Sequence, residues 1–328
     1  MKKFLLLIFC FCFIFPLSGC GNNAVREANM EYMVSSIGFD KAGQKIKIIA
    51  EIIIVNSGQG ETGAQPMLFS AVGKSPEDAM YKLHSKLSKP LMLNHSGLLV
   101  ISKKLSDEAV KEIMNICITD KNITGAIKLI ATENAEKLMN IKPNSDIALG
   151  YEISNALKQY SEFSGINYKN RFYEIESKRE GKTKCYALPY LSARKESYAI
   201  EGVLIYKNDS PVLALNNNSA IMYSLMSNSY GQGKIQIDNN QYEINLKSVK
   251  YDILYKSETL YVTMYLDIEA VDEVVEYLSY KIKNAPLFDE DIYYFADRIS
   301  RKKPQVWDKI KSDYKNIFKG ANLSFEVI

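Results

Sequence analysis

Two short apolar runs, Val203-Leu204-Ile205-Tyr206 and Val212-Leu213-Ala214-Leu215, are joined by Lys207-Asn208-Asp209-Ser210-Pro211. Asparagine, aspartate, serine and proline favour a tight turn, so this stretch predicts a β-hairpin. Alternating runs continue to residue 268, with further turns predicted at Asn239-Asn240 and at residues 256–259. We therefore expect antiparallel sheet from residue 200 to residue 268.

The N-terminal half predicts strands that alternate with helices. Residues 32–39 and 46–55 are rich in β-branched and aromatic side chains and predict a hairpin, whereas the glycine-rich residues 56–66 predict a loop. Helix-start serines and apolar periodicity then predict a series of elements. In chain order these are a helix after Ser75, a strand at 97–101, a helix after Ser106, a strand at 127–131, and helices at 133–141 and 147–161.

The remaining segments are less regular. Residues 164–198 are weakly periodic, and we expect irregular strands there, close to a domain boundary. In the tail, an amphipathic helix containing Ile292 is followed by one that opens at Pro304 and stops at Gly320. Residues 322–328 predict a last strand.

These elements predict an α+β protein of more than one domain, with mixed and antiparallel sheets and packed helices. We place an N-terminal α/β region at residues 32–198, with room for two subdomains. A C-terminal domain of antiparallel sheet plus helices follows at residues 199–328.

The first residues predict an export signal that ends in a lipid-attachment site. Lys2 and Lys3 precede twelve apolar residues, and about 20 would be needed to cross a bilayer. Leu17-Ser18-Gly19-Cys20 follows and resembles the bacterial lipobox. On that resemblance, residues 1–19 are removed, Cys20 carries a diacylglyceryl group, and residues 20–31 form a lipidated stalk. The alternative is an ordinary secretory signal in which Cys20 is incidental.

The mature chain would be close to neutral. Removal of residues 1–19 leaves 309 residues (328 − 19), with 39 basic (41 − 2) and 38 acidic side chains. This balance indicates neither a nucleic-acid surface nor a polybasic membrane cluster, so membrane attachment depends on Cys20. Because no second apolar run approaches membrane-spanning length, we expect a soluble body tethered by its lipid. Cys117 and Cys185 are expected as two separate buried thiols rather than a disulfide.

Few residues suggest catalysis. His84 and His95 have no cysteine or acidic residue at ligand spacing, so hydrogen-bonded structural histidines are favoured over a zinc site or a triad. The glycines of residues 58–63 lack the ending of a phosphate-binding loop. Asp289-Glu290-Asp291 fits the acidic first turn of a helix better than a cation site. We therefore expect no catalytic residue, metal or cofactor.

Several segments together resemble the Ger(x)C lipoproteins, the C subunits of spore germinant receptors. They follow the family's order over nearly the whole chain, although Gly21-Asn22 replaces the Trp-Asp that many relatives carry after the cysteine. The matching segments are Ser36-Ile37-Gly38-Phe39-Asp40-Lys41, residues 73–79, Leu91-Met92-Leu93-Asn94-His95, and residues 98–101, 201–207, 213–215, 291–295 and 301–307.

The resemblance implies a non-enzymatic subunit of a nutrient germinant receptor, needed for spore germination. It implies two multi-spanning partners, an A subunit and a transporter-like B subunit. It also implies a lipid-anchored position on the outer face of the inner spore membrane, where two acyl chains on Cys20 would give stable attachment. Whether this subunit contacts the germinant, and which germinant, is left open.

Two other classes were weighed. An extracytoplasmic solute-binding lipoprotein of a transporter would need two similar lobes with parallel sheets, and the antiparallel hairpins argue against it. A lipid-anchored hydrolase would need a nucleophile constellation that the sequence does not contain.

Overall fold

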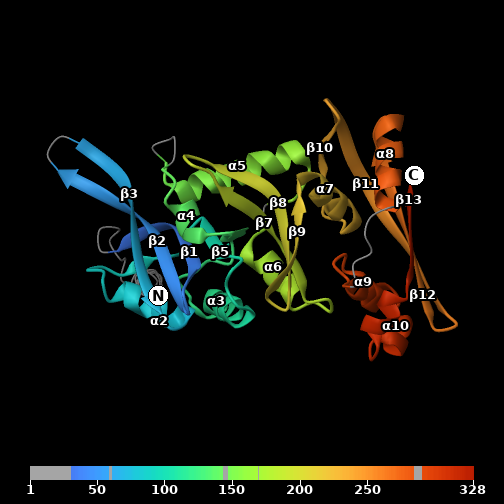
Figure 1. Ribbon diagram of the computed structural model, residues 1–328, viewed down its shortest axis with the longest axis horizontal. Helices are drawn as coiled ribbons and strands as arrows, with labels where there is room; N and C mark the ends of the chain where they lie inside the picture. The colour runs from blue at the N-terminus through green and yellow to red at the C-terminus, as the bar shows by residue number, and fades with distance from the viewer. Residues whose placement is uncertain (1–30, 59–60, 143–146, 169, 284–289) are drawn as a thin grey trace, which may run out of the picture.

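The chain folds around two β-sheets that follow one another along the long axis (Figure 1). The computed structural model describes residues 31–58, 61–142, 147–168, 170–283 and 290–328. Within these residues the larger sheet has nine strands and the smaller sheet has four. The expected α+β class, with mixed and antiparallel sheets, is confirmed.

The larger sheet combines parallel and antiparallel pairs. Its strands are β1 (Tyr32–Ala42), β2 (Lys45–Gly58), β3 (Glu61–Gly73), β4 (Leu91–Met92), β5 (Leu98–Ser102), β6 (Lys128–Thr132), β7 (Cys185–Ala193), β8 (Tyr198–Lys207) and β9 (Ser210–Asn216). They lie in the order β3-β2-β1-β5-β6-β7-β8-β9, and β4 pairs with β1. The β1–β5, β5–β6 and β6–β7 pairs are parallel, and the outer pairs on both sides are antiparallel. The two predicted hairpins therefore form the two sides of one mixed sheet.

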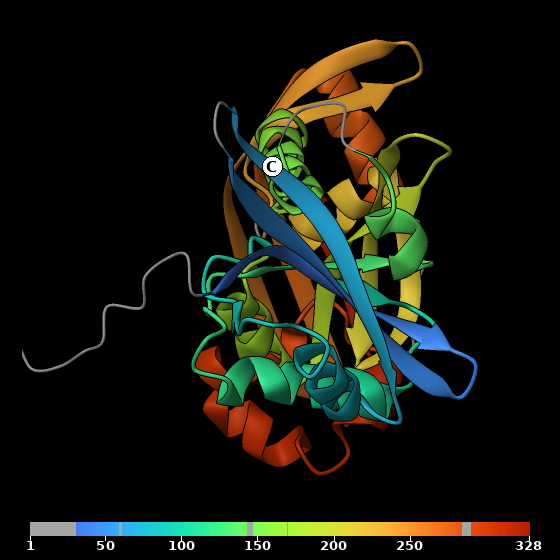
Figure 2. The same cartoon turned by 90° about the vertical axis from the view of Figure 1, so that its left-hand side faces the viewer.

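Helices cover both faces of this sheet, as Figure 2 shows for α5 and the α2–α3 pair. The helices on one face are α2 (Pro76–His84), α3 (Asp107–Thr119) and α6 (Phe172–Arg179), and those on the other are α4 (Ala135–Met139), α5 (Leu149–Ser164) and α7 (Asn217–Met226). Strand β5 is buried on both sides: Leu98 and Val100 enter one core, while Leu99 and Ile101 enter the other. Such two-sided burial is what a central parallel strand requires.

The smaller sheet forms the other end of the molecule. It consists of β10 (Gln232–Ile237), β11 (Asn240–Lys256), β12 (Thr259–Glu269) and β13 (Asn322–Val327), in that order, with β13 parallel to β12. Its helices are α8 (Asp272–Lys283), α9 (Phe295–Lys302), α10 (Pro304–Ile310) and α11 (Tyr314–Lys319). The core around α5 and α7 continues into this sheet, so apolar packing joins the two parts.

The predicted tight turns are present. Asn208 and Asp209 have φ values of 47° and 67°, and Ser257 and Glu258 have 49° and 61°. Two successive positive φ values are characteristic of the turn that best matches the twist of a hairpin. The β10–β11 turn begins at Asp238, one residue before the predicted pair. The hairpin register from residue 200 onward is therefore set by its turns.

Several predictions of local structure are wrong in whole or in part. Most of the predicted loop at 56–66 is strand, because β2 and β3 pair as far as Gly58 and Glu61; β3 is an edge strand, where Pro66 is tolerated. At 164–198 the expected irregular strand is present as β7, whose pairing with β8 shifts register between Tyr190 and Leu191. The helix α6 was not predicted there, because the weak local pattern does not reveal the burial of Phe172 and Ile175.

The helix predicted from Pro304 to Gly320 is interrupted between α10 and α11. The Asp313 carbonyl accepts hydrogen bonds from the amides of Asn316 and Ile317, which starts a new helix. Aspartate favours helix starts over helix interiors. The domain division at residue 198/199 stays a prediction, and β7 and β8 pair with each other on either side of it.

Candidate functional site

Cys20, the residue predicted to carry the lipid, lies outside the described residues. The described chain enters the larger sheet at Tyr32, whose backbone N–H donates to the Pro90 carbonyl at 2.8 Å. The Tyr32 hydroxyl lies 3.0 Å from Ser88 Oγ, and its ring stacks on Phe69 with 6.4 Å between centroids. The start of the body is therefore held in place by backbone and side-chain contacts.

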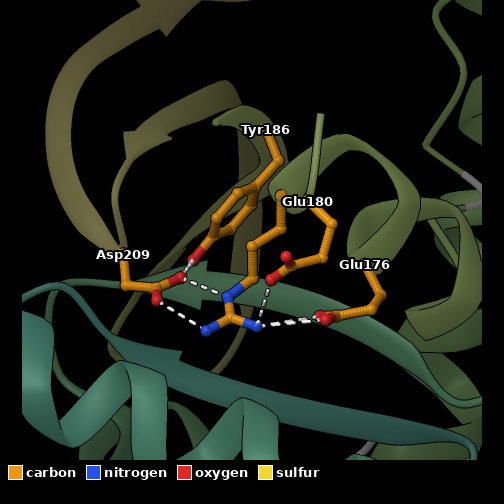
Figure 3. A network of polar contacts seen from close by, with 5 residues as sticks. Glu176, Glu180, Tyr186 and Asp209 are labelled. Atoms are coloured by element: carbon orange, nitrogen blue, oxygen red, sulfur yellow. Dashed lines mark hydrogen bonds and ion pairs between the residues drawn. The ribbon is translucent and has the colours of Figure 1, made fainter. Parts of the chain in front are cut away.

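A buried ionic cluster lies between α6 and the β8–β9 turn (Figure 3). Arg179 Nε donates to Asp209 Oδ1 at 2.8 Å, and Arg179 Nη2 donates to Asp209 Oδ2 at 2.9 Å. Tyr186 donates its hydroxyl to Asp209 Oδ1 at 3.0 Å. Arg179 Nη1 also reaches Glu176 at 3.1 Å and Glu180 at 3.4 Å. The cluster thus joins a helix, a strand and a hairpin turn.

The contacts of the cluster favour fixed charge states over proton transfer. The hydrogen bond with Asp209 raises the pKa of Arg179 against the opposing effect of burial, so the guanidinium stays charged. Burial, followed by the Asp209 charge, raises the pKa of Tyr186 well above its usual value. Both side chains of the central pair are almost fully buried, at 8% and 5% exposure. Removal of either partner would leave the other charge buried without its counter-ion.

A second set of buried polar contacts begins α9. Asp291 accepts hydrogen bonds from the backbone amides of Phe295 at 3.0 Å and Ala296 at 2.7 Å, and from the Tyr314 hydroxyl at 2.8 Å. Burial raises the pKa of Asp291, although these three hydrogen bonds oppose the shift. Asp291 therefore binds the first amides of α9 from a position ahead of the helix, and not from within its first turn as the sequence predicted. The helix expected to contain Ile292 begins at Phe295, and Asp289 lies outside the described residues.

Helix α9 connects the two sheets. The hydroxyls of Tyr223 on α7 and Tyr294 lie 2.8 Å apart in the core. Asp297 Oδ1 accepts from the backbone N–H of Lys182 at 2.9 Å, which links α9 to the loop before β7. Arg298 Nη2 donates to the Ser227 carbonyl at 2.6 Å, and its guanidinium lies 4.5 Å from the Tyr251 ring centroid on β11. The C-terminal helices are thus fastened to both sheets by specific contacts.

The other residues singled out from the sequence do not gather. His84 and His95 are exposed, on α2 and just before β5. Cys117 and Cys185 are free and buried in different cores, so the expectation of two separate thiols is confirmed. Burial raises the pKa of each thiol to about 12, which keeps both protonated and unreactive at neutral pH.

Two features are absent from the described part of the chain. No group of three or more His, Cys, Asp or Glu side chains there is arranged to hold a metal ion. No helix there has the length and apolar character needed to span a membrane.

The sequence alone did not reveal Arg179, Asp297 or Arg298. Arg179 lies in the segment expected to form irregular strands, and its partner Asp209 was noted only as a turn residue. A charged residue on the apolar side of a helix is a signal for such a pair, and Arg179 ends α6 on the face that carries Phe172 and Ile175. Its partner could not be chosen without the fold.

The fold is an α+β body built on two sheets of different size. The sequence model of the spore germination protein N-terminal domain matches residues 25–193, more than half of the 328 residues. The chain therefore belongs to the Ger(x)C family of spore germination proteins.

Two relatives agree with this assignment. The spore germination protein GerQC of Bacillus cereus is 21% identical over 294 residues, which cover 87% of this chain and 79% of the relative. The crystal structure of the GerBC protein matches with a TM-score of 0.53 at 13% identity, covering 89% of this chain and 95% of that chain. At this identity the structural match shows the shared fold.

Proposed function

We propose that this chain is a lipid-anchored, non-enzymatic subunit of a nutrient germinant receptor. The observation that carries the proposal is the position of the family domain, whose match begins at residue 25, directly after the lipobox-like Leu17-Ser18-Gly19-Cys20. A diacylglyceryl group on Cys20 would place the body on the outer face of the inner spore membrane. Residues 20–31 would then connect the lipid to the fixed entry point at Tyr32.

The chemistry of the described side chains supports a binding role. The ionisable groups at the centre of both buried clusters are engaged by protein partners: Asp209 by Arg179 and Tyr186, and Asp291 by two amides and Tyr314. Catalytic acids and bases instead need a free position for the substrate and a pKa near the working pH. The two buried thiols have pKa values raised away from that range.

The proposed partners are the multi-spanning A and B subunits of the receptor. A lipid on Cys20 would confine this chain to the same membrane and raise its effective concentration near them. Association could then depend on a modest protein interface. Two neighbouring reading frames that encode multi-spanning proteins, one of them transporter-like, would support this arrangement, whereas a gene beside ATP-driven transport components would weaken it.

The solute-binding alternative has less support. Such a protein would consist of two similar lobes around a ligand pocket. The two sheets described here contain nine and four strands, and they differ in strand pairing as well as in size. Similar lobes are therefore not formed by the described residues.

Replacement of Cys20 by Ala in spores tests the proposal. We expect Cys20→Ala to lower the amount of chain in the membrane fraction and to slow germination after a nutrient trigger. Cys12→Ala is the matched control, because Cys12 lies inside the predicted signal and would be removed with it. If Cys20→Ala left both membrane attachment and germination unchanged, the role of the lipid would be rejected.

A further inference from the structure

A polar cavity of about 460 Å³ lies where α6, the segment after α7 and α9 meet. Its lining includes Lys178, Ser227, Ser229, Asp297, Arg298 and Arg301. Cavities of a few hundred Å³ are of the size that holds small ligands. Three cationic side chains and one carboxylate give this lining a positive balance.

None of the three cations has a carboxylate partner within ion-pair distance among the described residues. Arg298 is 9% exposed and donates to the Tyr293 carbonyl at 2.5 Å and the Ser227 carbonyl at 2.6 Å. The Lys178 Nζ lies 5.3 Å from the Tyr294 ring centroid. Lys178 is half-buried, whereas Arg298 is buried. Buried cations are normally neutralised by an opposite charge, so the absence of a paired carboxylate at Arg298 requires an explanation.

The pKa values agree with an unneutralised pair. Burial lowers the pKa of Lys178, attraction to Glu174 on the same helix opposes this shift, and the Arg298 charge adds to it with the smallest effect of the three. Burial likewise lowers the pKa of Arg298 against weaker attraction from Tyr251 and Asp291. An anion in the cavity would offset both effects.

The carboxylate in the lining is already engaged. Asp297 Oδ1 accepts from the Lys182 amide at 2.9 Å, and Asp297 Oδ2 accepts from the amide and the hydroxyl of Thr183, each at 3.4 Å. Both carboxylate oxygens of Asp297 thus accept hydrogen bonds from the loop before β7. It therefore does not pair with the ammonium of Lys178 or the guanidinium of Arg298.

Donors remain available for a ligand. Arg298 uses two of its five N–H groups in its hydrogen bonds to carbonyls, and exposed Arg301 uses Nε for the Asp297 carbonyl at 3.0 Å. The hydroxyls of Ser227 and Ser229 lie 2.8 Å apart and can turn toward a bound group. Guanidinium and ammonium groups with nearby hydroxyls suit carboxylate or phosphate oxygens.

We propose that this cavity binds the oxyanion of a small molecule, a carboxylate or a phosphate group, between Lys178, Arg298 and Arg301. A purely structural role accounts for Arg298, since its contact with Ser227 places a cation at the C-terminus of α7. It does not account for Lys178, whose ammonium is brought beside a second cation. The proposal is independent of the lipid on Cys20 and of the receptor partners.

Anion-dependent thermal stability of the full chain, purified in detergent, tests the proposal. Inorganic phosphate and acetate are titrated separately against sodium chloride at equal ionic strength, which distinguishes the two kinds of oxyanion from general screening. We expect a saturable rise in the unfolding midpoint with at least one of them, because a ligand that binds the folded state stabilises it. No rise beyond that in chloride would overturn the proposal.

Single substitutions show whether the anion that raises the unfolding midpoint binds in this cavity. We expect Lys178→Met and Arg301→Met each to weaken the apparent affinity by about tenfold, the effect of losing one charged contact of about 1.4 kcal/mol. Lys111→Met, an exposed position on α3, is the matched control and should keep the wild-type response. Arg301 is exposed, so Arg301→Met remains decisive if Lys178→Met does not fold. An unchanged response in Arg301→Met would show that the anion binds elsewhere.

Discussion

Arg179 and Asp209 are thirty residues apart in the chain and form a buried ion pair through two parallel hydrogen bonds of 2.8 and 2.9 Å. Arg179 ends α6, inside the segment matched by the family's N-terminal domain, whereas Asp209 lies in the β8–β9 turn beyond residue 193. The pair therefore connects the family domain to the hairpin that follows it.

Loss of one partner from this pair should be strongly destabilising. Arg179→Met would leave the Asp209 carboxylate buried without its cation, which typically costs about 3–5 kcal/mol of the free energy of unfolding. Chemical denaturation measures the change. Lys311→Met is the control, because it breaks an exposed pair with Asp308 that is expected to be worth less than about 1 kcal/mol. Equal losses in the two variants would contradict this prediction.

Gly150 allows α5 to approach the larger sheet closely. The Glu51 carboxylate accepts from the amides of Leu149 and Gly150 at 2.9 Å each, and a Cβ on Gly150 would lie 2.6 Å from Ser36 Cβ. Gly150→Ala should therefore lower the free energy of unfolding by about 1–3 kcal/mol.

The control is Gly231→Ala, since a Cβ there meets nothing within 4 Å. The thermal unfolding midpoint and the free energy of unfolding of this control should stay close to those of the wild type. A wild-type stability for Gly150→Ala would show that α5 can move away from the sheet at little cost.

The hydroxyl pair of Tyr223 and Tyr294 should show coupled energetics. Either single change to Phe leaves the other buried hydroxyl without its partner, at a cost of about 1–3 kcal/mol. In Tyr223→Phe/Tyr294→Phe neither hydroxyl remains, so the loss should be smaller than the two single losses combined. A double-mutant cycle by chemical denaturation measures the coupling, and strict additivity would argue against a direct hydrogen bond.

Asp291 should make stability fall as the pH rises through its titration. Burial places its pKa in the folded state above the usual value of 3.8. The folded state then holds the proton more tightly, so the free energy of unfolding decreases between the unfolded and the folded pKa. The stability of Asp291→Asn relative to the wild type should therefore improve from about pH 3.8 upward and level off above the folded pKa.

Asp308→Asn, at an exposed position, serves as the control for this pH series. Unfolding of the three proteins is followed at matched ionic strength. A relative stability of Asp291→Asn that declined with rising pH would mean that the three hydrogen bonds outweigh burial.

Elements with strong local signals were predicted well. Ser75 and Ser106 cap their helices through hydrogen bonds from the amides of Asp78 and Ala109, as their spacing indicated. The hairpin from Tyr206 to Pro211 is present because Asn208 and Asp209 tolerate positive φ. Segments such as residues 56–66 failed because pairing with β2 overrides the turn preference of glycine and proline.

The sequence by itself determined the class of fold, the position of most strands and helices and the family resemblance, while the lipid site at Cys20 stays a prediction. These depend on residues close together in the chain, whose spacing and turn chemistry act locally. Only the tertiary structure decided that Arg179 meets Asp209, that Tyr223 meets Tyr294, and that Lys178 and Arg298 share a cavity. Partners for buried polar groups are chosen when distant segments pack together and lose water, and no local pattern encodes that choice.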